Sequence, residues 1–152
     1  MTTTLQLEKV REERTYHRGL DISLRHRCWG KDNPAVGANF IESDGNAQPV
    51  AVVFYKHRQL QAKYLVYTMR VHFNMAARLG IPYFLVDYDF QGGVLNIVLF
   101  PVDSIARTYY TSPGSITEPQ LVRLLHRLRG KELSRSDNEI QEQIEQRWKE
   151  IK

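Results

Sequence analysis

The chain has 152 residues, 42% of them hydrophobic, and its 21 Lys and Arg against 17 Asp and Glu give a net charge of +4. These values predict one compact domain with a real core. No apolar run approaches the roughly 18 residues that cross a bilayer, and the first residues lack a secretory signal. The single cysteine excludes an internal disulfide. We therefore expect a cytoplasmic, intracellular protein with no membrane contact.

Positive charge is concentrated in the body of the chain. No Asp or Glu lies between Asp44 and Asp87, a stretch that holds five Lys and Arg residues. Residues 131–152 carry a net charge of −1, so the first 130 residues carry +5. Such a surface would attract phosphate groups and would bind them less tightly as salt increases. An ordinary solvated helix face is the alternative interpretation.

The first predicted elements are a helix and a hairpin. Apolar residues recur among charged ones over residues 5–27, which predicts a helix. A hairpin is predicted over residues 38–56, because Asp44-Gly45-Asn46 is a tight-turn signal and residues 51–55 form a continuous apolar run. Such a run is typical of a strand buried on both faces, in the middle of an α/β sheet.

A second helix and two further strands are predicted after the hairpin. Apolar residues at helical spacing predict the helix over residues 58–79, which Gly80 would cap. Strands are expected over residues 83–89 and 94–100, with a turn between them at Gln91-Gly92-Gly93. Irregular structure is expected after Pro101.

Two helices complete the chain. Thr117 and Gln120 have the spacing of a capping box, which predicts a helix from residue 117 to Gly130. Over residues 137–151 a narrow stripe of four apolar side chains either packs within the chain or pairs with a partner or a second copy. The sequence thus predicts an α/β domain over residues 1–130, with a central mixed sheet flanked by helices, and a C-terminal helical extension over residues 131–152.

Several short stretches carry a family resemblance: residues 25–30, 34–36, 40–42, 49–56, 79–84 and 124–130. They follow the order helix, hairpin ending in a lysine, helix, strand, strand. In this the chain resembles the restriction-endonuclease-like superfamily, also called PD-(D/E)XK nucleases, and more narrowly small phage and bacterial proteins of uncertain function. The resemblance spans roughly residues 15–130. It implies a nuclease-like α/β fold and a site at the hairpin.

The resemblance places the family lysine at Lys56 and an acid two residues earlier, where this chain has Phe54. Asn39 occupies the position of the first acid, either naturally or as an inactivating substitution. In the superfamily, carboxylates would hold Mg²⁺ or Mn²⁺ and the metal would activate water. With the phenyl ring of Phe54 and the amide of Asn39 at these positions, the site has too little negative charge to bind the metal tightly. Glu42 and Asp44 would compensate as catalytic groups, or they have turn and surface roles.

Asp87 and Asp89 form a second pair of carboxylates, on one face of a later strand. They would hold a metal ion near the sheet edge, or they are simply exposed at a strand end. The histidines show no metal-ligand spacing with Cys28, so no metal site is predicted from them.

The favoured function is binding of nucleic acid, most readily DNA, by a nuclease-like scaffold whose phosphodiesterase site is weak or lost. Six residues are predicted to contact phosphates: Arg25, Arg27, Lys31, Lys56, Arg58 and Lys63. Two alternatives remain open. One is an active Mg²⁺- or Mn²⁺-dependent endonuclease that uses Glu42 and Asp44 or Asp87 and Asp89. The other is a protein-binding module, such as a phage-encoded inhibitor or a dimeric adaptor that works through the C-terminal helix.

Overall fold

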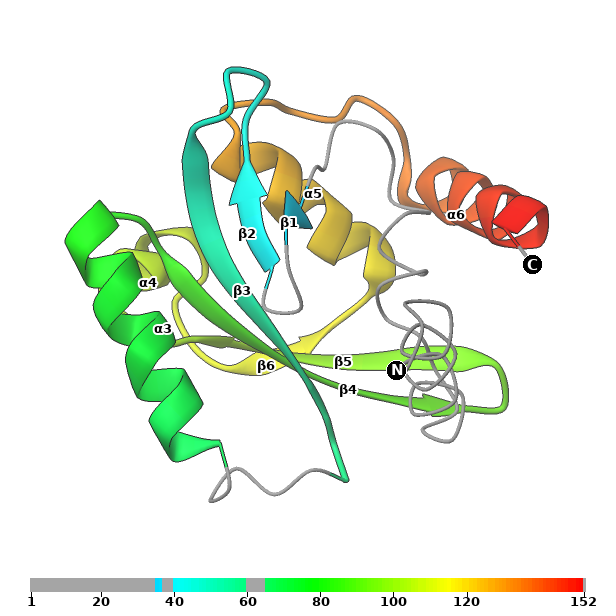
Figure 1. Cartoon of the computed structure of the whole chain (residues 1–152). Helices are drawn as coiled ribbons and strands as arrows, with labels where there is room; N and C mark the ends of the chain where they lie inside the picture. Colours follow the sequence, from blue (N-terminus) through cyan, green and yellow to red (C-terminus); the bar gives the residue numbers. More distant parts are fainter. Residues whose placement is uncertain (1–34, 37–39, 60–64, 152) are drawn as a thin grey trace, which may run out of the picture.

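The computed structural model describes residues 35–36, 40–59 and 65–151, and the predicted helix over residues 5–27 lies outside them. The elements are β1 (Ala35–Val36), β2 (Phe40–Ser43), β3 (Pro49–His57), α3 (Val66–Leu79), β4 (Tyr83–Gln91), β5 (Val94–Pro101), α4 (Ala106–Tyr109), β6 (Gly114–Ile116), α5 (Glu118–Leu128) and α6 (Asp137–Ile151). Figure 1 shows a twisted central sheet with helices on both sides. The predicted α/β class with a mixed, helix-flanked sheet is confirmed.

The strands form one six-stranded sheet in the order β1-β2-β3-β4-β5-β6. β3 and β4 are parallel, and the chain between them runs through α3. All other neighbouring strands are antiparallel. The two outermost strands, β1 and β6, have two and three residues, and short edge strands limit unwanted pairing with other chains.

The two faces of the sheet carry separate cores, because successive side chains of a strand point to opposite faces. On one face, Val53, Tyr55 and Val86 pack with apolar residues of α5 and α6. On the other face, Val52, Phe54 and Leu85 pack beneath α3 around Ala76. The apolar run of β3 is therefore buried on both sides, as its sequence predicts.

Helix α3 begins later than predicted. Arg58 and Gln59 form a turn after β3 and are not helical. The Arg58 N–H donates to Tyr88 O at 2.8 Å, which prolongs the hydrogen bonding between β3 and β4 by one residue. The helix is assigned from Val66 and ends as predicted at Gly80, whose φ is +66°. Residues 60–64 are not among those described.

The remaining turns and caps follow the predicted pattern. Gly92 and Gly93 have φ values of +58° and +78°, so they supply the positive φ that a two-residue hairpin between β4 and β5 requires. Thr117 and Gln120 form the capping box of α5. The short strand β6 and the single turn α4 were not predicted, since three or four residues give no periodicity to recognise.

The apolar stripe of α6 packs within the chain. Ile140 and Ile144 are buried in the same core as the sheet and α5, and Trp148 packs against it. Ile151, the last member of the stripe, is exposed. Among the two predicted uses of this stripe, the structure thus shows internal packing. Within the described ranges, no helix combines the length and apolar character needed to cross a membrane.

Candidate functional site

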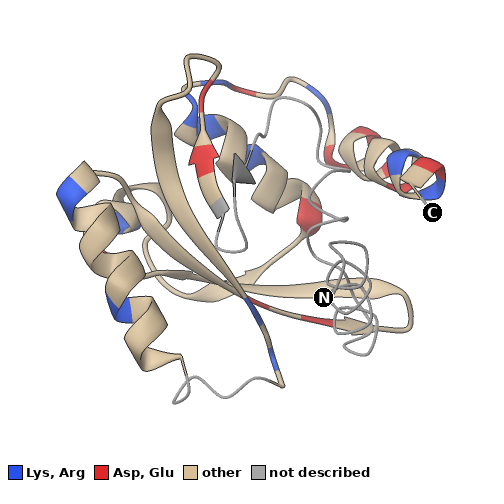
Figure 2. Ribbon diagram, viewed as in Figure 1, with Lys and Arg blue, Asp and Glu red and all other residues tan. Residues whose placement is uncertain are grey.

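The end of β3 and the second half of β4 bring together two pairs of charged residues that lie 29–31 positions apart in the sequence. The parallel register places Lys56 opposite Asp87, and alternation along each strand puts Arg58 and Asp89 on the same face. We call Lys56, Arg58, Asp87 and Asp89 the charged cluster. It contains the predicted lysine and the predicted second pair of carboxylates, and Figure 2 shows basic segments of β3 beside acidic segments of β4 where the two strands cross.

The members of the charged cluster are paired with one another. Lys56 Nζ lies 2.9 Å from Asp87 Oδ2. The Arg58 guanidinium bridges both acids, with Nε 3.2 Å from Asp87 Oδ1 and Nη1 2.9 Å from Asp89 Oδ2. The expectation that Asp87 and Asp89 are simply exposed at a strand end is wrong, because their side chains are only 17% and 14% exposed and both are ion-paired.

Two neutral side chains also form hydrogen bonds with Asp89. Asn96 Nδ2 donates to Asp89 Oδ1 at 3.0 Å from the neighbouring strand β5, and Gln91 Nε2 donates to Oδ2 at 3.4 Å. Two cations and two carboxylates balance to zero charge, so a divalent ion would have to displace Lys56 or Arg58 to gain the carboxylates. In the part of the chain that the structure describes, no group of three His, Cys, Asp or Glu side chains is placed to hold a metal ion.

Phe54 lies on the same face as Lys56, at the position where the superfamily carries an acid. Its ring is buried beneath α3, and its centroid lies 5.1 Å from that of the His72 ring. Burial lowers the pKa of His72 and raises the pKa of the neighbouring Tyr83 to about 12. Phe54 thus packs among apolar side chains and near the rings of His72 and Tyr83. None of these groups provides a negative charge that could bind a metal ion.

Glu42 does not join the charged cluster. The β2–β3 register pairs Glu42 with Ala51, which places its side chain with Tyr55 on the face opposite Lys56. The carboxylate is fully buried and forms an ion pair with Arg129 Nη2, whose side chain is 1% exposed. Burial, and secondarily the Glu42 charge, raises the pKa of the Tyr55 hydroxyl. Glu42 therefore has an internal structural role, which neither predicted alternative included.

Asp44 has the predicted turn role. Its Oδ1 accepts hydrogen bonds from the backbone N–H groups of Asn46 at 2.8 Å and Gln48 at 2.9 Å, which is the usual way that Asp stabilises a turn. This arrangement occupies the carboxylate at the tip of the β2–β3 hairpin. The structure therefore does not bring Asp44 to Lys56.

The predicted phosphate contacts are only partly described. Arg25, Arg27, Lys31, Lys63 and the catalytic candidate Asn39 lie outside the described residues, so their predicted roles stay predictions. Lys56 is 6% exposed, and its ammonium is directed at Asp87 rather than outward. Arg58 is 42% exposed and is the member of the charged cluster that solvent reaches most readily.

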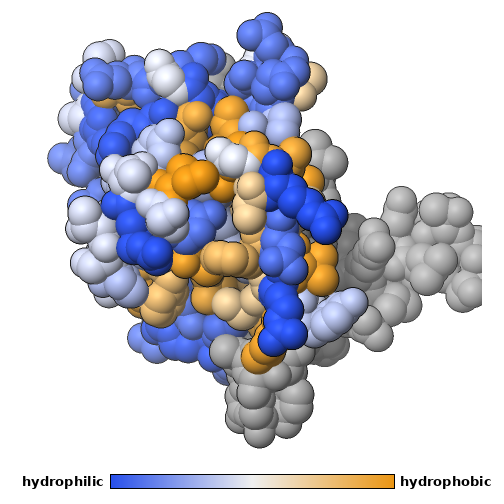
Figure 3. Space-filling model, turned by 90° about the vertical axis from the view of Figure 1, so that its left-hand side faces the viewer, coloured by the Kyte–Doolittle hydropathy of each residue, from blue (hydrophilic) through white to orange (hydrophobic). Residues whose placement is uncertain are grey.

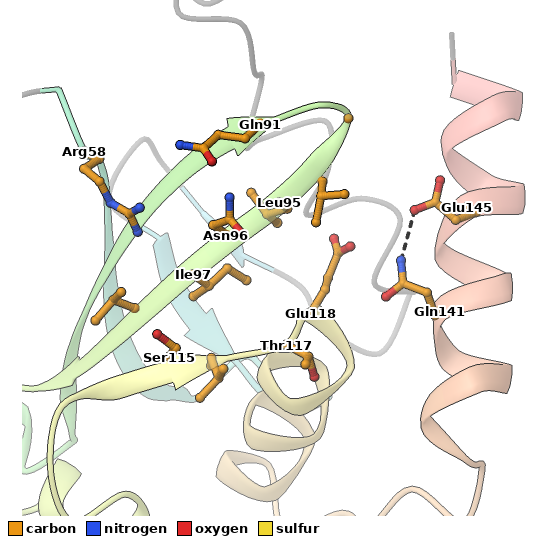
Figure 4. Close-up of a pocket in the computed structure, with 14 residues that line it drawn as sticks. Arg58, Gln91, Leu95, Asn96, Ile97, Ser115, Thr117, Glu118, Gln141 and Glu145 are labelled. Atoms are coloured by element: carbon orange, nitrogen blue, oxygen red, sulfur yellow. Dashed lines mark hydrogen bonds between the residues drawn. The ribbon is translucent and has the colours of Figure 1, made fainter.

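A cavity of about 760 Å³ lies next to the charged cluster, along β5. Its lining includes the apolar side chains of Leu95 and Ile97 and the carboxyl-bearing side chains of Glu118 and Glu145. Figure 4 shows Glu118 at the start of α5 and Glu145 on α6, across the cavity from Arg58. The charged side chains of the described lining are thus these two glutamates and Arg58, which is itself paired with Asp87 and Asp89.

Arg129 is the residue of this region that sequence reasoning missed. Besides its pairing with Glu42, its Nε donates to Ser43 O at 2.8 Å and its Nη1 to Leu125 O at 2.7 Å. Arg129 lies 87 positions from Glu42 in the sequence, and no motif or spacing links the two.

Searches of family models, curated proteins and solved structures found no match to this chain.

Proposed function

We propose that this protein binds nucleic acid through an α/β domain of the restriction-endonuclease-like kind and has little or no phosphodiesterase activity. The observation that carries the proposal is the internal neutralisation of the charged cluster. At the position of the family lysine, Lys56 pairs with Asp87, while Arg58 bridges Asp87 and Asp89. A lysine and two carboxylates are present, but the negative charge that would hold Mg²⁺ is already neutralised.

The distribution of the remaining charge supports binding without cleavage. No acidic residue lies between Asp44 and Asp87, and Arg58 is exposed within that stretch. Cations on a surface attract the phosphate backbone whatever its sequence, by release of counterions. In this proposal Arg58 contacts phosphate together with Arg25, Arg27, Lys31 and Lys63, and Lys56 holds Asp87 in place.

Binding is tested by fluorescence anisotropy with labelled single-stranded DNA, duplex DNA and RNA over a series of salt concentrations. Replacing Arg25, Arg27 and Lys31 together by Gln should weaken binding and reduce the slope of log Kd against log salt by about one for each phosphate that is no longer neutralised. Lys149→Gln, an exposed cation on α6, is the matched control and should leave the slope unchanged. Failure of the unaltered protein to bind any of the three nucleic acids would refute the proposal.

A metal-dependent nuclease is the second candidate, because Asp87 and Asp89 lie on one face beside Lys56. Incubation of the three nucleic acids with protein and Mg²⁺ or Mn²⁺ distinguishes the two functions. We expect no cleavage above that of the Asp87→Asn variant, and no rise in melting temperature when either metal is added. Metal-dependent cleavage that Asp87→Asn abolishes would show that the protein is a nuclease and would refute the proposal that it has little or no phosphodiesterase activity.

A further inference from the structure

The outer face of α3 carries most of the exposed large hydrophobic side chains of the described residues. Of seven such side chains, five lie on this helix, and Tyr67 is 80% exposed. We call them, with the two arginines between them, the α3 outer face: Val66, Tyr67, Arg70, Val71, Phe73, Arg78 and Leu79. Figure 3 views the molecule from the side on which α3 lies and shows hydrophobic patches beside strongly hydrophilic side chains.

The exposed residues form two neighbouring rows along the helix. Val66, Arg70 and Phe73 follow one another at intervals of four and three positions, and Tyr67, Val71 and Arg78 follow at intervals of four and seven, so the two rows make up one broad side of α3. The inward side is formed by Leu65, Met69 and Ala76, which pack on the sheet. Helix α3 therefore carries apolar side chains on its exposed side as well as on the side that packs on the sheet. Exposed apolar side chains that are grouped in this way are typical of an interaction surface.

The charge of the face indicates what would cover it. Arg70 and Arg78 are exposed, neither forms an ion pair with another of the described residues, and the first turn of the helix contains no acidic residue. A second copy docked through its own α3 would place arginines against arginines with no carboxylate between them. Nucleic acid would satisfy the arginines and stack on Tyr67, but it would gain little from Val66 and Leu79.

We propose that the α3 outer face is a docking surface for a protein partner whose contacting helix has an apolar seam flanked by Asp and Glu. The partner's apolar side chains would contact Val66 and Phe73 in one row and Tyr67 and Val71 in the neighbouring row. Its carboxylates would pair with Arg70 and Arg78. Tyr67 and the arginines are of the residue types that most often dominate binding energy. This surface goes beyond the proposed nucleic-acid binding and uses none of the charged cluster.

The probe that tests the proposal is a synthetic amphipathic helix with a leucine seam flanked by glutamates, titrated into isotopically labelled protein and followed by NMR. Amide shifts should concentrate in residues 66–79, and binding should weaken as salt increases. The same peptide with lysines in place of the glutamates should not bind. Equal binding of both peptides, absence of binding, or shifts located elsewhere would each overturn the proposal.

Two variants and a control make the test specific. Tyr67→Ser with Phe73→Ser should weaken binding of the glutamate peptide at least about tenfold, and both side chains are exposed enough for the fold to tolerate the change. Arg70→Glu with Arg78→Glu should transfer binding to the lysine peptide. Val94→Ser, which removes a 61% exposed side chain outside α3, should change nothing.

Two other occupants would be detected in the same experiment. A concentration-dependent mass that Tyr67→Ser with Phe73→Ser abolishes would show that a second copy covers the face, and it would refute a heterologous partner. Shifts on residues 66–79 induced by single-stranded DNA, with none from the glutamate peptide, would assign the face to nucleic acid and would also refute the proposal. A protein that binds the peptide but no nucleic acid would contradict the proposed function alone.

Discussion

At the scale of single residues, the charges of this protein differ in how far they are removed from water. Glu42 and Arg129 are almost completely buried as a pair, whereas Arg123 and Asp137 form an ion pair with side chains that are 33% and 56% exposed. Desolvation makes the first pair costly to break, because the remaining charge would stay buried without compensation. The second pair is largely solvated and contributes little.

Glu42→Ala should therefore destabilise the protein by about 3–5 kcal/mol, since the Arg129 guanidinium would lose its buried counter-charge. Asp137→Ala is the matched control and should cost about 1 kcal/mol or less. Urea denaturation followed by circular dichroism measures both free energies of unfolding. A Glu42→Ala variant no less stable than Asp137→Ala would show that the buried pair does not hold β2 against the end of α5.

His72 gives the protein a dependence of stability on pH. Its ring is buried between Phe54 and Tyr83, and its Nδ1 has no hydrogen-bond partner among the described residues. Burial lowers its pKa from the usual 6.5. As pH falls below about 6.5, the unfolded chain binds a proton at His72 that the folded chain does not, so the free energy of unfolding decreases until the folded pKa is passed.

Replacing His72 with Phe should flatten that decrease between about pH 7.5 and pH 5. The difference between the two pH profiles isolates His72, because the other four of the five histidines are common to both proteins. Thermal or urea unfolding at a series of pH values gives the profiles. Parallel profiles for the two proteins would mean that His72 is protonated in the folded state as readily as in the unfolded chain.

At the scale of elements, α6 is the segment for which the structure distinguishes between two interpretations. The sequence left open whether the apolar stripe packs within the chain or pairs with a partner, and Ile140 and Ile144 are 3% and 1% exposed in the core that α5 and the sheet also form. Arg123 of α5 also reaches the segment before α6, donating to Leu133 O at 2.9 Å. Pairing with a partner through this stripe would first require α6 to detach from that core.

Ile144→Ala should accordingly cost about 2–5 kcal/mol, the range for deleting a buried aliphatic side chain. Ile151→Ala on the same helix is the control, because Ile151 is 36% exposed and should cost less than about 1 kcal/mol. Equilibrium unfolding of the two variants makes the comparison. Equal, small effects would mean that α6 detaches from the domain in solution.

At the scale of the whole molecule, local signals in the sequence predicted the main elements well. The buried run of β3, the glycine that ends α3 and the capping box of α5 each depend on residues a few positions apart, and each was found where expected. The charged cluster required the parallel register of β3 and β4, which pairs Lys56 with Asp87. That register depends on the packing of α3 across both strands, so the sequence identified the residues of the cluster but not their pairing.

The order of the strands in the sheet, which matches their order in the chain, bears on how the protein folds. Each strand can join the sheet beside the strand that precedes it, so most strand pairings close short loops at a small entropic cost. Among the described strands, longer connections join β3 to β4, through α3, and β5 to β6, through α4. Covering the sheet is different, because the pairing of Glu42 with Arg129 joins segments 87 positions apart. One face of the sheet therefore acquires its core only after the carboxyl-terminal helices α5 and α6 have been synthesised.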